Sequence, residues 1–265
     1  MIQYTLYFFI FISSWYYQSY FFNLFTYNKL YLFFINFIIY WFIGFIYLCL
    51  DYYKLPFIEK YKVHNTNKNI YLKNILPNIL LNHIISFITF ILYTSYINKG
   101  LLIYSINSLN SLCLLTIECC LFFILFDIIF YIGHRLIHFP ILYKYIHKTH
   151  HNINANIAIS GYYMDIIDYF IEFMCPLYFS IYILNTNILV LFICSIIGQI
   201  NGLISHSAYD FPFLPYEKDH LYHHLELHCN YGIVFTDYLF NTKRNKNFPN
   251  NHISQKSNKS LYLYF

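Results

Sequence analysis

The sequence predicts an all-α protein built as a bundle of about four to six membrane-spanning helices. Of its 265 residues, 58% are hydrophobic and only 11% are charged, whereas soluble domains carry about 25% charged residues. The apolar residues also form several runs of about 20, the length that a helix needs to cross a bilayer. Polar, lysine-containing stretches separate these runs, as expected for loops. These observations favour an integral membrane protein.

Five apolar stretches are the candidate spans. They lie at about residues 4–26, 31–50, 79–97, 111–133 and 169–205. The first is longer than the apolar part of a signal peptide, so we expect a retained span there. The last is interrupted at residues 185–187 (Asn, Thr, Asn). It is long enough for a hairpin of two spans or for two half-buried helices.

The loop at 51–75 predicts the orientation of the bundle. It contains five lysines: Lys54, Lys60, Lys62, Lys68 and Lys73. Cytosolic loops carry an excess of positive residues, so we place this loop in the cytosol. Each later pair of spans makes a round trip. The segments after residue 133 and after residue 205 are therefore expected on the cytosolic side as well.

The net charge and the cysteines indicate which partners and bonds are not expected. The net charge is only +4, and no basic stripe interleaved with exposed aromatics is present, so nucleic acid is not an expected partner. The seven cysteines lie mostly in apolar runs and are expected to be free. We expect three regions: membrane spans and the lysine loop at 1–110, a catalytic unit at 111–242, and a flexible polar tail at 243–265.

Histidines form two clusters at the predicted cytosolic face. His134 and His138 are four residues apart and should share one helix face. Pro140 ends that helix, and a new helix from Ile141 is expected to present a second group on one face. That group is His147, His150 and His151, and its i, i+3, i+4 spacing recurs in His220, His223 and His224.

These clusters predict metal binding. Eight imidazoles, with His206 as a ninth, exceed the three or four ligands of one zinc site and suit two metal ions. Imidazole accepts several metals, so the ligands alone do not select one. The H-E-x-x-H pattern of zinc proteases is absent. A redox-active pair beneath an apolar bundle would suit oxidation of a lipid chain by O₂, which zinc cannot perform.

Four segments carry a resemblance to a known family. They are "FDIIFYIGHRLIH", "YKYIHKTHH", "HSAYDFP" and "HLYHHLELHCNYG". Together they resemble the motifs of the fatty acid hydroxylase / sterol desaturase superfamily of membrane-bound di-iron oxidases. The likeness covers about residues 120–242, and the residues of its motifs are most similar to those of sterol C4-methyl oxidases.

The resemblance implies a ligand set, cofactors and partners. Iron ligation is implied for His134, His138, His147, His150, His151, His206, His220, His223 and His224. It further implies two iron ions, O₂ as co-substrate, and electrons from NAD(P)H through a separate cytochrome b5 or reductase. A membrane lipid, sterol or fatty-acyl, is the implied substrate. The endoplasmic reticulum membrane is the implied location, with the histidines facing the cytosol.

Several positions depart from the family pattern. Asp165 stands where many relatives have a further histidine, and Ala208 replaces the glycine of HSGY. The usual W-D-x-x-F-G-T appears as "TDYLFNT", two residues early. Asp127 lies seven residues before His134 and is expected to bind an imidazole N–H, as metal-bound histidines require. Asn230, within the third motif, is a second candidate for supporting the metal ligands.

Two alternatives remain open from the sequence. The first is a metal-binding membrane protein without oxidase activity, either zinc-bound or degenerate. The second is a metal transporter. A transporter needs ionisable residues along its spans on both sides of the membrane, whereas the clustered histidines lie at one face.

Overall fold

The computed structural model describes residues 29–64, 72–97, 108–186, 188–214, 218–233 and 235–244. The predicted span at 4–26 and residues 245–265 of the predicted tail lie outside these ranges. Within them the regular structure is helical. The one β contact among the described residues is an isolated bridge between Lys62 and Tyr209. The all-α prediction is confirmed.

Five helical segments of the described part are long and apolar enough to cross a membrane. They are Leu30–Tyr53, Leu72–Ser95, Leu109–Ile137, Ile166–Leu184 and Ile188–Ser205. The first three belong to α3 (Lys29–Tyr53), α5 (Leu72–Leu92) and α6 (Leu109–Ile137). The fourth joins α8 (Ile166–Tyr169), a π-helical turn at Phe170–Met174 and α9 (Cys175–Leu184), and α10 (Ile188–Ser205) is the fifth.

Local signals explain where these helices begin and end. Ser108 and Ser111 form a capping box at the start of α6, in which each hydroxyl accepts from the other residue's backbone N–H. Asn185 takes the left-handed conformation (φ 48°) at the end of α9, and its N–H donates to Ile181. The predicted interruption at 185–187 therefore separates two antiparallel helices, which confirms the hairpin.

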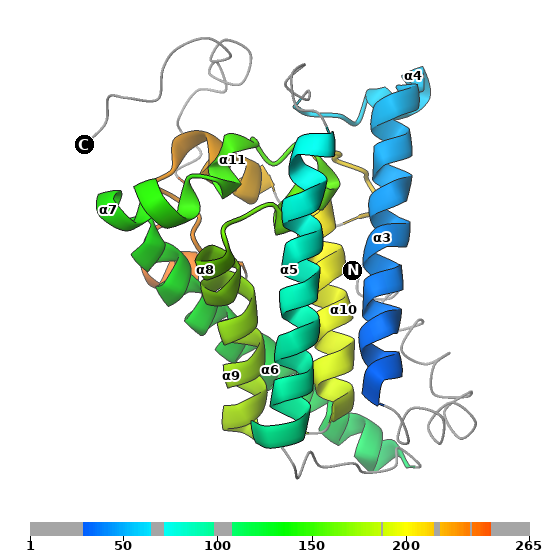
Figure 1. The fold of residues 1–265 in the computed structure, drawn as a ribbon, viewed down its shortest axis with the longest axis vertical. Helices are drawn as coiled ribbons and strands as arrows, with labels where there is room; N and C mark the ends of the chain where they lie inside the picture. The colour runs from blue at the N-terminus through cyan, green and yellow to red at the C-terminus, as the bar shows by residue number, and fades with distance from the viewer. Residues whose placement is uncertain are drawn as a thin grey trace.

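The long helices pack side by side, and the short ones gather mainly at one end of the bundle (Figure 1). α6 packs on α9, and α10 packs on α3. The short helices include α4 (Pro56–Glu59), α7 (Pro140–Leu142), α11 (Lys218–Glu226) and α12 (Thr236–Leu239). The outer surface of the bundle exposes apolar side chains such as Phe42 and Phe45. A bilayer would cover these side chains.

Lys62 differs from the other lysines of the 51–75 loop that the structure describes. Its side chain is 2% exposed, and its Nζ lies 2.5 Å from a carboxylate oxygen of Asp51. It also donates to the backbone carbonyls of Asn156 and Ser207, at 3.1 and 2.8 Å. Lys62 is therefore an internal brace that ties α3 to the segment next to His206. It is not a surface positive charge.

Candidate metal centre

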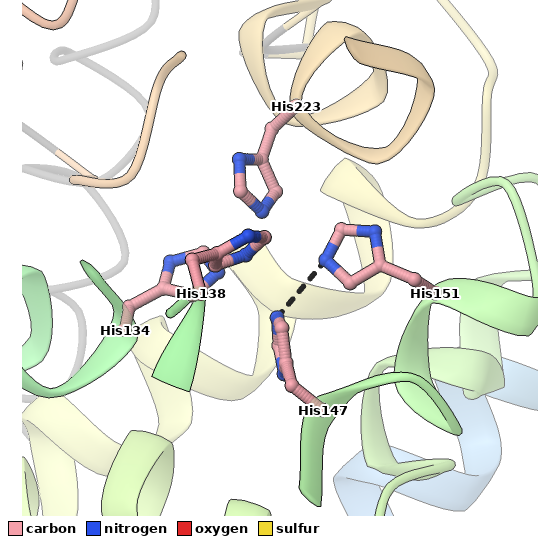
Figure 2. A group of neighbouring side chains, drawn as sticks. All are labelled: His134, His138, His147, His151 and His223. Atoms are coloured by element: carbon pink, nitrogen blue, oxygen red, sulfur yellow. Dashed lines mark hydrogen bonds between the residues drawn. The ribbon is translucent and has the colours of Figure 1, made fainter. Parts of the chain in front are cut away.

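The nine predicted ligands come together at one end of the bundle as two groups. Side-chain nitrogens within 4.8 Å of one another define a five-histidine group and a four-histidine group. The five-histidine group is His134, His138, His147, His151 and His223, whose rings converge in Figure 2. The four-histidine group is His150, His206, His220 and His224. The prediction that both clusters share one end of the bundle is confirmed.

The segment after Pro140 does not form the single helix that we predicted. Phe139 is extended (ψ 137°), α7 begins at Pro140, and the chain then passes through a π-helical turn at Tyr143–His147 and a 3-10 turn at His150–Asn152. The changing helical pitch rotates the side chains away from a common face. His147 and His151 consequently join the five-histidine group, whereas His150 joins the other group.

α11 likewise serves both groups. His223 points to the five-histidine group, and His220 and His224 belong to the four-histidine group. His220 and His224 are one turn apart and share a face, while His223 lies about 100° around the helix from its neighbour His224. One short helix therefore bridges the two groups and determines their separation.

The spacing of the ring nitrogens fits ligands around a shared ion. The Nε2–Nε2 distances are 2.9 Å for His147–His151, 3.0 Å for His206–His220 and 3.1 Å for His220–His224. Metal–imidazole bonds of about 2.1 Å place neighbouring ligand nitrogens about 3.0 Å apart at right angles. The His150–His206 distance of 3.4 Å matches the wider, tetrahedral angle.

Backbone carbonyls determine which nitrogen of each ring carries the proton. The Nδ1 of His134 and of His223 each lie 2.7 Å from a carbonyl oxygen, of Tyr231 and Cys229. A carbonyl only accepts hydrogen bonds, so Nδ1 must be the donor and Nε2 keeps its lone pair. The Nε2 atom of His223 is buried and has no hydrogen-bond partner, and the buried Nε2 atom of His134 lies 3.3 Å from Glu172 Oε1. Both rings are therefore arranged as metal ligands are.

The four-histidine group follows the same rule. His206 and His224 donate from Nδ1 to the carbonyls of Gly202 and Ile153, each at 2.9 Å. His150 Nδ1 lies 3.4 Å from the carbonyl of Tyr163. The Nε2 atoms of His150 and His206 therefore face one another with two lone pairs. A cation bound between them would make this arrangement favourable.

Burial keeps these imidazoles neutral. Desolvation is the main cause that lowers the pKa of His206 and of His223 to about 4, although a backbone hydrogen bond to each raises it slightly. Burial also holds the pKa values of His150 and His224 well below the ordinary value. At neutral pH the rings are in the form that binds a metal ion.

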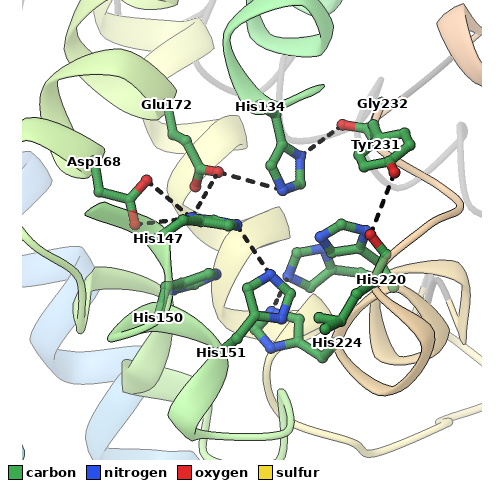
Figure 3. Close-up of polar contacts among 12 residues, drawn as sticks. His134, His147, His150, His151, Asp168, Glu172, His220, His224, Tyr231 and Gly232 are labelled. Carbon is green, nitrogen blue, oxygen red and sulfur yellow. Dashed lines mark hydrogen bonds and ion pairs between the residues drawn. The ribbon is translucent and has the colours of Figure 1, made fainter. Parts of the chain in front are cut away.

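Two carboxylates that the sequence reasoning missed lie behind the five-histidine group. Figure 3 shows Asp168 of α8 and Glu172 of the following π-helical turn directed toward His147 and His134. Asp168 is fully buried, and its two oxygens lie 2.9 and 3.0 Å from His147 Nδ1. Glu172 Oε1 lies 3.3 Å from His134 Nε2. Two carboxylates four residues apart in an apolar run were the available signal.

Asp127 has a different partner from the one we predicted. Its carboxylate accepts hydrogen bonds from the backbone N–H groups of Ile233, Phe235 and Thr236, at 2.7, 2.8 and 3.1 Å. The expected contact between a carboxylate and an imidazole is made by Asp168 instead. Asp127 thus anchors the loop whose Tyr231 carbonyl holds His134, so it acts on the metal group through the backbone.

The shortened C-terminal motif retains an ordered structure. Asp237 accepts hydrogen bonds from the N–H groups of Tyr231 and Gly232, at 2.8 and 2.7 Å. A Cβ on Gly232 would lie 2.1 Å from the hydroxyl oxygen of Thr236, so only glycine fits there. Asn230 accepts from the N–H of Arg244 and donates to the carbonyl of Asp219. Asn230 therefore supports the loop, and its hydrogen bonds are not to a ligand ring.

The other departures have local explanations. Asp165 caps α8 by accepting the N–H of Ile167 at 2.9 Å, and it belongs to neither histidine group. Ala208 adopts the positive φ (57°) that glycine would favour, and Asn241 does the same (φ 55°) at the glycine position of "TDYLFNT". His228 bonds to the Glu226 carbonyl and lies outside both groups. All seven cysteines are free, as predicted.

The family of this segment follows from comparison with known proteins. Residues 119–242 match the fatty acid hydroxylase family model, and this range contains every histidine of the two groups. This segment is similar to the fatty acid hydroxylase family. The predicted resemblance, which covers about residues 120–242, is confirmed.

Individual relatives cover different shares of the chain. Fatty acid hydroxylase domain-containing protein 2 of Homo sapiens is 32% identical over 127 residues, which are 48% of this chain and 38% of the relative. The C-4 methylsterol oxidase erg25 of Schizosaccharomyces pombe is 30% identical over 130 residues, or 44% of this chain and 43% of the relative. Methylsterol monooxygenase 1 of Rattus norvegicus is 26% identical over 201 residues, or 71% and 68%.

The first two matches span less than half the length of those relatives. No solved structure gives a significant match to the chain.

Proposed function

We propose that the protein is an iron-dependent, O₂-using hydroxylase or desaturase of a membrane lipid, with a sterol or fatty-acyl substrate. The observation that carries the proposal is the pair of buried histidine groups, in which backbone carbonyls and Asp168 fix the tautomers and leave Nε2 atoms directed at one another. The family match and the named activities of relatives, fatty acid hydroxylase and methylsterol monooxygenase, support it.

The residues present fit two metal ions. The five-histidine group would hold one ion, and the four-histidine group the other. When bound, redox-active iron supplies the reduction of O₂ and the oxidation of an unactivated C–H bond, which zinc does not. The described chain contains buried ring nitrogens without a hydrogen-bond partner, as such ions require, at His138 and His223.

The protein's own contribution is orientation and exclusion of water. Seven of the nine ligand histidines are less than 9% exposed, His138 and His220 being the half-buried exceptions. The Tyr231 and Cys229 carbonyls hold two rings of the five-histidine group, and Asp168 holds a third. Because Cys229 and Asp168 are buried, the rings they hold would keep one orientation while substrate and O₂ exchange.

The remaining parts of the proposal concern the surroundings of the catalytic unit, which we place at residues 111–242. The five apolar helices would embed it in a membrane, proposed to be the endoplasmic reticulum. The histidine groups would face the cytosol, where a separate cytochrome b5 or reductase would deliver electrons from NAD(P)H. The lysine loop supports this orientation, although burial of Lys62 removes one of its positive charges.

Metal analysis and oxygen consumption of the purified, detergent-solubilised protein test the proposal. We expect about two iron ions per chain and O₂ uptake that depends on an added lipid and a reductant. Zinc alone with no turnover under reducing conditions would replace the proposal with a metal-binding protein without oxidase activity. Metal flux into vesicles that contain the protein would revive the transporter alternative.

The substrate is identified from cells. Lipid extracts of cells that lack the protein are compared with extracts of complemented cells, and the oxidised species that disappears names the substrate class. An unchanged lipid profile in the deleted strain would contradict the lipid-oxidase proposal.

A further inference from the structure

His83 is a buried histidine that belongs to neither metal group. It lies in the middle of α5 and is only 6% exposed. Its ring packs against the rings of Tyr40, Tyr162, Phe37 and Trp41, with centroid distances of 4.7, 5.0, 5.0 and 5.6 Å. Its Nε2 atom is buried and has no hydrogen-bond partner. A polar atom in this position within a membrane bundle is costly unless something binds it.

A cavity of about 80 Å³ lies beside His83, between α3, α5, α6, α9 and α10. Gln199 of α10 also lines this cavity, and its Oε1 atom is likewise buried without a partner. Tyr162 lies beside both side chains, because its ring packs against His83 and it lines the same cavity as Gln199. Two unsatisfied polar atoms therefore border one small space.

The other polar side chains of the cavity wall whose hydrogen bonds are described have partners. Ser195 donates to Asn36 Oδ1 at 3.0 Å, and Asn36 donates to the Leu32 carbonyl at 3.0 Å. Ser86 is hydrogen bonded to Tyr169. Most of the remaining wall is aliphatic or aromatic. The unpaired polarity of the cavity is thus concentrated at His83 and Gln199.

We propose that this cavity binds the hydroxyl-bearing end of a neutral membrane lipid. A hydroxyl both donates and accepts, so it is a neutral group that can serve an acceptor such as Gln199 Oε1 or a ring nitrogen such as His83 Nε2. No aspartate, glutamate, lysine or arginine lines the cavity. An ionised fatty acid or a phosphate headgroup would therefore be left without a counter-charge in an apolar space, whereas an alcohol would not.

The position of the cavity separates the bound hydroxyl from the metal centre. Gln199 precedes His206 by seven residues on α10, which corresponds to about 10 Å along the helix axis. No histidine of either metal group lines the cavity. The site therefore selects a lipid by a polar group remote from the metals, and this selection does not depend on the oxidase chemistry.

Photo-crosslinking in detergent micelles tests the proposal. The probe is hexadecan-1-ol with a diazirine on its chain, and the readout is label in the peptides of α5 and α10. Unlabelled competitors are tested in two pairs, each an alcohol and its hydrocarbon: hexadecan-1-ol with hexadecane, and cholesterol with cholestane. The first pair reports binding of a linear alcohol and the second reports binding of a sterol. We expect at least one alcohol to compete about 3- to 10-fold better than its hydrocarbon, the effect of one neutral hydrogen bond.

Two substitutions locate the effect. His83→Phe keeps an aromatic ring in the aromatic surroundings, and Gln199→Met keeps the length of the side chain. Each should remove most of the alcohol preference while the protein still labels. Ile84→Phe is the matched control, because Ile84 adjoins His83 in sequence but is 56% exposed, and it should keep the preference.

Equal competition by alcohols and hydrocarbons would overturn the proposal and would mean that the two polar atoms meet only water. An alcohol preference that survives both His83→Phe and Gln199→Met would also overturn it. The measurement needs no turnover, so an inactive or zinc-bound protein leaves its outcome interpretable. Failure of the oxidase proposal and failure of this one are therefore distinguishable.

Discussion

Replacing Asp168 with Asn measures what one buried carboxylate contributes to the five-histidine group. Asp168 is 0% exposed, and both of its oxygens lie within 3.0 Å of His147 Nδ1. The carboxylate holds the proton on Nδ1 and directs Nε2 toward the other ligands. Asn has nearly the same volume and can still accept one hydrogen bond, but it carries no charge. The variant should therefore fold, with His147 less firmly oriented.

The expected magnitude follows from the kind of bond that is lost. Hydrogen bonds to an ionised acceptor are roughly twice as strong as neutral ones, and loss of such a partner behind a ligand histidine typically lowers metal affinity about 10- to 100-fold. Because Asn retains one acceptor, we expect the lower part of this range, about 10-fold, or roughly 1.4 kcal/mol. The four-histidine group should keep its affinity, since Asp168 contacts none of its rings in the described hydrogen bonds.

Titration of the metal-depleted protein with Co²⁺ against a chromophoric chelator resolves the two affinities. Asp165→Asn is the matched control. Asp165 lies three residues earlier and caps α8, and Asn caps a helix as well as Asp does. This control should bind both ions like the original protein. Equal affinities in the Asp168→Asn variant and the original protein would refute the argument that this carboxylate orients His147.

Three further predictions test the ligands, the brace and the loop. His150 and His223 belong to different histidine groups. His150→Ala and His223→Ala should therefore each reduce bound metal from about two ions per chain to about one and abolish activity. Full metal content by elemental analysis in either variant would contradict the assignment of that histidine as a ligand. Lys62→Met should destabilise the protein by about 2 kcal/mol, since it removes the cation paired with the partly buried Asp51 carboxylate. Thermal unfolding in detergent measures this, and an unchanged midpoint would show that Lys62 is no brace. Gly232→Ala should lower the stability of the fold by about 2 kcal/mol through overpacking and weaken metal binding. Gly198→Ala is the control, because a Cβ there meets nothing within 4 Å, and it should leave the stability unchanged. Equal effects of the two substitutions would argue against a clash at Gly232.

Sequence patterns predicted the membrane-spanning helices well, because each helix depends on the local properties of its own segment. Apolar length determines whether a helix can cross a bilayer, and the second to fifth stretches all appear as helices. The hairpin was predictable from the polar break at Asn185. The end of α6 was predictable from Pro140, whose ring forces Phe139 out of the helical region. The N-terminal stretch at 4–26 lies outside the described residues and stays a prediction.

The regular helix expected after Pro140 was wrong for an equally physical reason. Spacing of i, i+3 and i+4 predicts one face only where the pitch is constant at 3.6 residues per turn. The chain instead changes from a π-helical to a 3-10 turn between His147 and His150. That change delivers neighbouring rings to two different histidine groups. The histidines were identifiable from sequence, but their division into groups was not.

Composition and local pattern therefore determined the all-α membrane architecture and the nine candidate ligands, and four motifs carried the resemblance of the 119–242 segment to the fatty acid hydroxylase family. Only the tertiary structure decided which of these histidines gather in the same group and which side chains support them. It assigned Asp168 to His147 and gave Asp127 to the 233–236 loop. It also placed Lys62 inside the protein and set His83 beside an unsatisfied Gln199. These pairings join residues of different helices, and helix packing sets their distances, which periodicity along one segment does not encode.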